Sequence, residues 1–172
     1  MVNVQESSKT KINSADQKFA MELGRGYDAE QQYLQALREC EQQANNQQLK
    51  SILQMHSQQT QEQIKNLKQI FQTMGQKPQP IPCQSARALV EEGKQILQQI
   101  NNPVLKDCAI ASGQAKVEAI EIASYNGLII AAQQKGQKDV VNLLMKNKLE
   151  EEKTAAAYGL CLLELSKQAV SA

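Results

Sequence analysis

The chain has few of the residues on which most active sites and most binding surfaces depend. Its 172 residues include one histidine and no tryptophan, and aromatic residues make up 3%. Lys and Arg number 19 against 18 Asp and Glu, so the charge of +1 offers no basic patch for nucleic acid and no acidic tail. One histidine cannot support a convincing Ser/His/Asp or Cys/His triad, and no glycine-rich phosphate loop occurs. These absences weigh against an enzyme without excluding one.

The chain also lacks long apolar runs and paired cysteines. No run approaches the 18 residues of a membrane-spanning helix, and no signal-peptide pattern is visible. The four cysteines, Cys40, Cys83, Cys108 and Cys161, show no CxxC spacing. We therefore expect free thiols in a cytoplasmic protein that binds neither membrane nor nucleic acid.

Helical periodicity is what the chain has in abundance. No stretch alternates apolar and polar residues as a strand does, which predicts an all-α fold. Ser14 is placed to cap the first helix, and Asn102-Pro103 to open a later one. Three prolines on alternate positions in 77–82 exclude helix there. The predicted helices cover about 15–44, 47–74, 84–100, 103–136 and 137–169.

Four of these helices have similar lengths, and the third is short. Matched lengths favour an antiparallel four-helix bundle, in which the proline segment and the short helix form a crossover between the second and third long helices. Residues 1–14 are polar and are predicted to be a flexible arm, while residues 15–172 form the single bundle domain.

Glutamates interrupt apolar seams in three of the long helices. Steps of three and four residues place each seam on one helical face, the face that packs inward. A carboxylate there is costly unless it is protonated, paired or bound to a cation. The seams are Leu23-Tyr27-Glu30-Leu34-Leu37, Ile110-Gln114-Val117-Glu121-Ser124-Leu128 and Val141-Met145-Leu149-Glu152-Ala156-Gly159-Leu163, and Glu118 lies one turn before Glu121.

These carboxylates form a candidate metal site. Inward carboxylates from several helices are how helical bundles build such sites, and oxygen ligands suit iron, manganese or another divalent metal. The predicted ligands are Glu30, Glu118, Glu121 and Glu152. In the alternative, one or more of them lie at a seam edge and pair with a lysine, for which the neighbours are Lys116, Lys148 and Lys153.

The second long helix has a polar centre without clear carboxylates. Its seam contains His56, Gln59 or Thr60, and Gln63. His56 is a further candidate ligand, and so is Glu62, which lies next to Gln63 in the sequence. The alternative for His56 is a hydrogen-bonded core residue, and Glu62 can equally face solvent. An amide-rich lining binds metal less tightly than carboxylates and imidazoles do.

Several short segments carry a resemblance to a known family. They are Tyr27-Asp28-Ala29-Glu30-Gln31-Gln32, His56 with Thr60, Lys106-Asp107-Cys108-Ala109, Lys116-Val117-Glu118, Glu121-Ile122-Ala123-Ser124-Tyr125 and Leu149-Glu150-Glu151-Glu152-Lys153-Thr154. Over roughly residues 16 to 160 the chain resembles the YciE/YciF family of ferritin-like bacterial proteins. The resemblance implies a ferritin-like bundle with an extra short helix, frequent dimerisation, a di-metal site and an association with stress responses.

The chain also departs from that family pattern. Gln58 and Gln59 stand where the family usually has glutamates, and Ala119 stands where it often has a histidine. Ala156 replaces an acidic residue, and Arg87 replaces a glutamate of the short helix. A complete ferritin-type site, with Glu-x-x-His on two helices, therefore cannot be assembled here.

Together these observations predict a five-helix, ferritin-like bundle that binds metal through a reduced carboxylate site and takes part in stress responses. The alternative is a metal-free bundle that serves as a structural or protein-interaction module. An oxygen-activating oxidase ranks behind both, because it needs two redox metals with histidine support. The expected partner is a second copy of the chain. The expected cofactor is iron, manganese or another divalent metal, or none in the metal-free alternative.

Overall fold

The computed structural model describes residues 11–171 of the chain. They form five α-helices: α1 (Ala15–Gln43), α2 (Gln47–Thr73), α3 (Gln84–Gln99), α4 (Pro103–Gln134) and α5 (Lys138–Ser171). These bounds agree with the predicted ones to within about two residues, and the described residues contain no strand, which confirms the all-α prediction. Residues 1–10 of the predicted flexible arm lie outside the described residues.

Helix ends occur where the sequence supplies caps. The side chains of Ser14, Asn46 and Asn102 each accept a hydrogen bond from a backbone N–H in the first turn of α1, α2 and α4. Gly75 and Gly136 follow α2 and α4 with φ angles of 69° and 66°, a left-handed conformation that favours glycine. The chain therefore reverses direction at points that local sequence determines.

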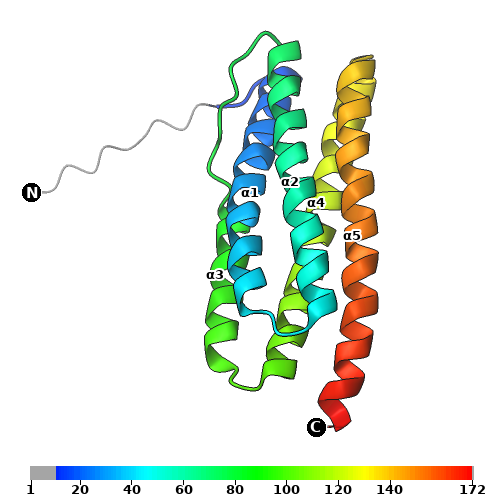
Figure 1. The fold of residues 1–172 in the computed structure, drawn as a ribbon. Coiled ribbons are helices and arrows are strands. Elements are labelled where there is room, and N and C mark those ends of the chain that lie inside the picture. Colours follow the sequence, from blue (N-terminus) through cyan, green and yellow to red (C-terminus); the bar gives the residue numbers. More distant parts are fainter. Residues whose placement is uncertain (1–10, 172) are drawn as a thin grey trace, which may run out of the picture.

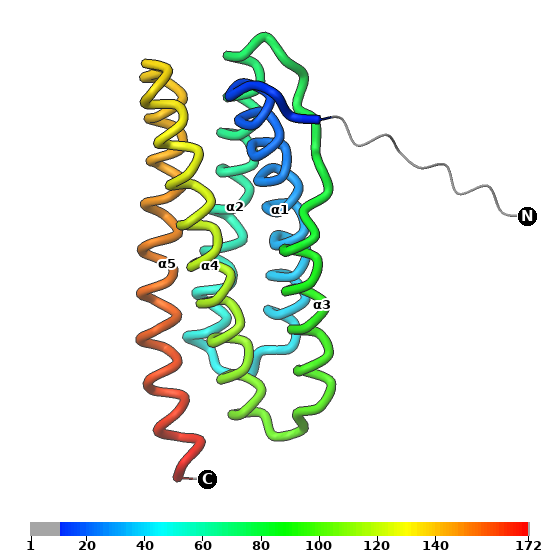
Figure 2. Tube along the Cα trace, turned by 180° about the vertical axis from the view of Figure 1, so that it is seen from behind, coloured from blue at the N-terminus to red at the C-terminus, as the bar shows by residue number. Residues whose placement is uncertain are grey.

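The four long helices form an antiparallel bundle. In Figure 1, α1 and α5 run in one direction, and α2 and α4 run in the other. Contacts join α1 to α2, α2 to α5, α5 to α4 and α4 to α1, so each long helix packs between two antiparallel neighbours. Figure 2 shows α3 outside this square, where it contacts α1 and α4. The predicted bundle with a crossover helix is confirmed.

The linker between α2 and α3 is held against α1. The backbone N–H of Ile81 donates to the carbonyl of Gly24 at 3.0 Å. A Cβ atom on Gly24 would lie 2.8 Å from Ile81 Cγ1 and 2.9 Å from the carbonyl oxygen of Gln79, so this close approach requires glycine. The Cys83 N–H, at the start of α3, donates to Asp28 Oδ2 at 2.8 Å. α1 thereby positions the whole crossover.

The core contains three apolar clusters. One joins Ala29, Tyr33 and Val117 to Cys83 and Ala86 of the crossover, and the other two are separated by a polar layer. Along each long helix, most buried polar residues fall between residues of these two clusters; Asp107, near the start of α4, is an exception. The first cluster includes Phe19, Leu23, Leu67, Ile70, Leu128 and Leu144. The second includes Leu37, Leu49, Leu53, Ile110, Tyr158 and Leu165. The polar layer at mid-height is where the predicted site should lie.

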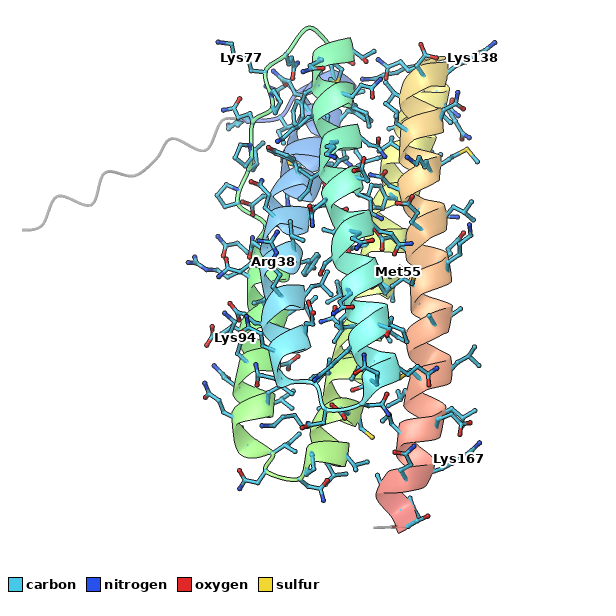
Figure 3. The ribbon with its side chains drawn as sticks, viewed as in Figure 1. Arg38, Met55, Lys77, Lys94, Lys138 and Lys167 are labelled. Carbon is cyan, nitrogen blue, oxygen red and sulfur yellow. The ribbon has the colours of Figure 1, made fainter. Side chains whose placement is uncertain are left out.

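Charged side chains cover the outside of the bundle along its length. Figure 3 shows Lys77 and Lys138 at one end, Lys94 on α3, and Lys167 near the other end of α5. None of the helices in residues 11–171 is long and apolar enough to cross a membrane. All four cysteines are free thiols, as predicted.

Candidate metal centre

Three glutamates and the histidine meet in the polar layer. His56 comes from α2, Glu118 and Glu121 from α4, and Glu151 from α5. Each offers one ligand atom, and these atoms all lie within 4.8 Å of one another. None of the four residues is more than 5% exposed. Such a convergence of buried ligand atoms is the arrangement a metal ion requires.

Glu30 of α1 adds a further carboxyl group on the α1 side of this layer. It is 2% exposed, and the hydroxyl of Tyr125 donates a short hydrogen bond to its Oε1. Asn147 of α5 donates to the same hydroxyl at 3.1 Å and accepts from Asn66 of α2 at 2.6 Å. This chain of hydrogen bonds links all four long helices beside the cluster and orients Glu30.

Burial determines the protonation of the cluster. It raises the pKa of Glu118 to about 11 and that of Glu151 to about 7, and neighbouring carboxyl groups contribute to the rise. The pKa values of Glu30 and Glu121 are likewise raised well above their usual range, first by burial and then by the other carboxylates. Burial lowers the pKa of His56 to about 3. Without a cation, the cluster therefore holds protonated carboxyl groups beside a neutral imidazole.

His56 has a polar partner on each ring nitrogen. Its Nε2 lies 3.1 Å from Glu118 Oε1 and 3.8 Å from Glu151 Oε2. Its Nδ1 lies 3.1 Å from the hydroxyl of Tyr158, which can donate or accept. A metal bound at Nε2 would require the proton on Nδ1, where the Tyr158 oxygen can accept it. This is the kind of support that metal-binding histidines receive from a neighbouring acceptor.

Several buried oxygens in the cluster receive no hydrogen bond from an amide or hydroxyl group of the described residues, so only neighbouring carboxyl groups can pair with them. They are Glu30 Oε2 and both carboxyl oxygens of Glu118 and of Glu151. The contact of Glu118 Oε1 with His56 Nε2 is the exception described above. The side-chain amide of Gln63, which is fully buried, is also without a partner. Leaving such groups unpaired costs about 1–3 kcal/mol each. A cation bound by these oxygens would offset that cost, so the residues present fit a metal.

The donor set indicates which ion would fit. Carboxylate oxygens with one imidazole suit iron, manganese or zinc better than the softer ions that prefer thiolates. The ligands would be Glu118, Glu121, Glu151 and His56, with Glu30 as a neighbouring carboxylate.

One predicted ligand points away from the cluster. Glu152 is exposed, and its Oε1 lies 2.6 Å from Lys148 Nζ. The predicted inward face of α5 is therefore wrong by one residue, and Glu151 occupies the place expected for Glu152. The buried face of α5 comprises Val140, Leu144, Asn147, Glu151, Thr154, Tyr158, Cys161 and Leu165. The alternative of a seam-edge glutamate paired with lysine describes Glu152 correctly.

The other predicted ligands also divide into residues that reach the polar layer and one that faces solvent. Glu30, Glu118, Glu121 and His56 all lie in the polar layer. Glu62 is exposed and pairs with Lys65 at 2.6 Å, so it does not reach the cluster.

Two positions that depart from the family pattern, Ala119 and Gln59, face different surroundings: one faces solvent and the other is half-buried. Ala119 is exposed, because the residue that shares the face of Glu118 is Glu121, three positions on. Gln59 is half-buried and accepts from the hydroxyl of Thr154 at 3.0 Å, and Thr154 lies about one helical turn after Glu151. A histidine at position 119 would therefore face solvent.

An antiparallel four-helix bundle with a crossover helix and a carboxylate–histidine layer at mid-height defines a ferritin-like protein. The family described as Domain of unknown function (DUF892) matches residues 14–170. The chain belongs to this family, and the resemblance to YciE/YciF proteins is confirmed.

Individual relatives agree with this assignment. Protein YciF of Escherichia coli is 29% identical over 128 residues, which are 74% of this chain and 76% of YciF. The solved structure of YcfI from Rhodopseudomonas palustris is 32% identical with a TM-score of 0.86, covering 88% of this chain and 96% of that one. The E. coli stress protein YciF matches at 25% identity, also with a TM-score of 0.86, covering 91% and 99%.

Proposed function

We propose that this protein binds a divalent transition metal in its polar layer. The observation that carries the proposal is the convergence of His56, Glu118, Glu121 and Glu151, whose ligand atoms lie within 4.8 Å of one another in a buried site. Together with Glu30, the three glutamates of the cluster make four carboxylates, which would offset the charge of two divalent ions; one ion would need fewer of them.

The residues of the chain have distinct roles in this proposal. Glu118, Glu121 and Glu151 would release their protons and bind the ion through oxygen, while His56 would bind through Nε2 and pass its proton to Nδ1 beside Tyr158. Iron or manganese held there would supply redox or Lewis-acid chemistry. Tyr125 would keep Glu30 oriented toward the layer.

The biological setting follows from the relatives. E. coli YciF is described as a stress protein, and on that similarity we propose a stress-associated role for this chain. Four free thiols support a cytoplasmic location, where the reducing environment keeps cysteines unpaired.

The test compares two neighbouring glutamates. Protein purified without chelator is analysed for bound metals, and calorimetry measures Mn(II) and Fe(II) binding to the metal-free form. Glu151→Gln should weaken binding by roughly tenfold or more, because a buried ligand is lost. Glu152→Gln is the matched control, since Glu152 is exposed and pairs with Lys148, and it should bind as wild type does. Equal affinities for both variants, or no binding by the wild type, would contradict the proposal.

A second candidate role rests on a different observation. α5 exposes large apolar side chains at helical spacing, with Met145 52%, Leu149 50%, Leu160 66% and Leu163 54% exposed. Large exposed apolar side chains gathered on one helix in this way mark interaction sites more often than solvated faces, although the Lys148–Glu152 ion pair interrupts this one. Ala156 and Gly159 lie between these residues and allow close approach of a partner helix. We propose that this face of α5 joins two copies of the chain, with or without metal.

A further inference from the structure

A pocket of about 80 Å³ opens between α1 and α4 and reaches the candidate metal centre. Glu30 and Glu121 both form part of its wall. His56 and Glu151, which come from α2 and α5, are not among the residues that line it. The pocket therefore approaches the cluster from the α1–α4 side and ends at two of its carboxyl groups.

The lining of this pocket mixes apolar residues, among them Ala29, Ile120 and Leu128, with polar side chains that occur from its surface to its inner end. Ser124 lies exposed near the surface, and Glu22 and Arg25 are half-buried. Further in are Glu30 and Glu121, which are 2% and 5% exposed. Because the outer part carries one acidic and one basic side chain, its charges present no net repulsion to a cation. The oxygens that a cation would meet belong to Ser124, which is exposed, then to Glu22, which is half-buried, and then to the buried Glu121 and Glu30.

The inner end of the pocket has an unpaired acceptor. Glu30 Oε2 is buried, has no donor among the described residues and belongs to a residue in the pocket wall. Gly26 keeps the α1 side of the pocket open, because no heavy atom lies within 4 Å of the place where its Cβ would stand. A larger side chain at this position would occupy the opening without displacing a neighbour.

We propose that this pocket is the entry route by which a divalent cation reaches the cluster. A hydrated cation must exchange its water ligands one at a time, and the Ser124 hydroxyl and the carboxylates of Glu22, Glu121 and Glu30 can replace them in sequence. The inference rests on the proposed function, since it requires a metal at the cluster.

A second pocket supplies an internal comparison. It has a volume of about 100 Å³ and lies between α1, α3 and α4, near Lys94, which Figure 3 labels. Its walls include Leu89, Val90 and Leu97, and no carboxylate of the cluster belongs to them. Gly113 lines this pocket, and its Cβ position is as open as that of Gly26. The second pocket is thus suited to a control substitution.

The experiment blocks each pocket in turn. Stopped-flow absorption measures the rate at which metal-free protein takes up Co(II), and calorimetry measures the equilibrium affinity. Gly26→Phe should slow uptake by roughly tenfold or more while leaving the affinity nearly unchanged, because an obstacle in the path does not alter the free or bound state. Gly26→Ala, which leaves the opening wide, and Gly113→Phe, which fills the other pocket, should take up Co(II) at the wild-type rate.

The outcomes separate the route from the site. Uptake by Gly26→Phe at the wild-type rate would overturn the entry route while leaving the metal site intact. Absence of Co(II) binding by the wild type at equilibrium would overturn the proposed function, and the route with it. Circular dichroism checks folding, and Ser124→Phe obstructs the same pocket from α4 if Gly26→Phe does not fold. Slow uptake by that variant would support the route equally.

Discussion

The hydroxyl of Tyr158 lies 3.1 Å from Nδ1 of His56, on the side of the ring opposite to Glu118. Both side chains are at most 1% exposed, and their rings meet edge to face with centroids 5.7 Å apart. The tyrosine therefore fixes the orientation of the imidazole and can stabilise either of its neutral tautomers. The ring of the one histidine in the sequence is therefore held in a fixed orientation within the polar layer.

Removing this hydroxyl should weaken metal binding. Tyr158→Phe deletes the partner of Nδ1 but keeps the ring, and loss of such a supporting hydrogen bond typically costs 10–100-fold in metal affinity. Calorimetric titration with Mn(II) or Co(II) measures the effect. Tyr27→Phe is a suitable control, because the Tyr27 ring packs against Phe71 in the first apolar cluster. Unchanged affinity in Tyr158→Phe would mean that His56 is not a ligand.

The metal-free protein should lose stability as pH rises from about 4.3, the usual value for an unfolded glutamate. The pKa values of four buried carboxyl groups are raised on folding, so the folded state binds more protons than the unfolded state above that pH. Ionisation of Glu151 at about 7 places part of the loss near neutrality. The lowered pKa of His56 acts in the opposite sense below about 6.5, but it is one group against four.

Thermal melts between pH 5 and 8 test this dependence. Glu151→Gln should melt higher than wild type at pH 8 without metal and should flatten the slope, whereas Glu152→Gln should do neither. Saturating metal should remove the trend in the wild type, because it binds the ionised form. A metal-free wild type whose melting temperature rises over this range would contradict the assignment of protonated carboxyl groups.

The contact of the linker with α1 makes Gly24 intolerant of side chains. Gly24→Ala places a Cβ within 3 Å of Ile81 and of the Gln79 carbonyl, and such overpacking typically costs about 1–3 kcal/mol. Gly93→Ala, within α3 and with open space around it, should instead stabilise by up to about 1 kcal/mol. Denaturant unfolding of both variants measures the difference. A stabilised Gly24→Ala would show that the linker does not pack as described.

Asp107 of α4 forms hydrogen bonds with the backbone of the turn that joins α1 to α2. Its two carboxylate oxygens accept from the backbone N–H groups of Asn45 and Asn46, each at 2.8 Å. Asp107→Ala leaves both amides without that partner and should lower the free energy of unfolding by about 1–3 kcal/mol, while Asp107→Asn should cost less because it keeps one acceptor oxygen. Chemical denaturation measures both. A change smaller than that of the exposed Glu164→Ala would argue that water replaces the carboxylate.

The apolar face of α5 should control self-association. Leu160→Glu with Leu163→Glu places two charges in that face and should convert a dimer to a monomer, as measured by light scattering after size-exclusion chromatography. Leu105→Glu, at an exposed position near the start of α4, is the control and should leave the mass unchanged. A wild type that is monomeric at high concentration would refute the proposed dimer.

The helix bounds were predictable because their signals are local. Ser14, Asn46 and Asn102 cap helices through contacts within three residues, and prolines exclude helix from the linker whatever it packs against. The inward faces of α1 and α4 were also predictable, since each has one marked apolar seam. Glu30, Glu118 and Glu121 accordingly lie where the spacing indicated.

The inward face of α5 was not predictable, because two apolar stripes run along this helix one residue apart. Leu144, Tyr158 and Leu165 belong to the stripe that packs in the core, and Met145, Leu149 and Leu163 to the one that faces outward. Both satisfy the same periodicity, so spacing alone cannot choose between Glu151 and Glu152. The contact between His56 and Glu118 depends on how α2 and α4 face each other diagonally across the bundle, which no local pattern encodes.

The crossover has a consequence beyond connectivity. Cys83 and Ser85, at the junction of the linker with α3, contribute to the wall of the α1–α4 pocket, and Asp28 anchors that junction through the Cys83 amide. Lengthening or shortening the linker would therefore change the aperture of the pocket while every candidate ligand stayed in place. Two relatives with identical carboxylates could differ in which solutes they admit, and natural variation in this single connection would be enough to tune that selectivity.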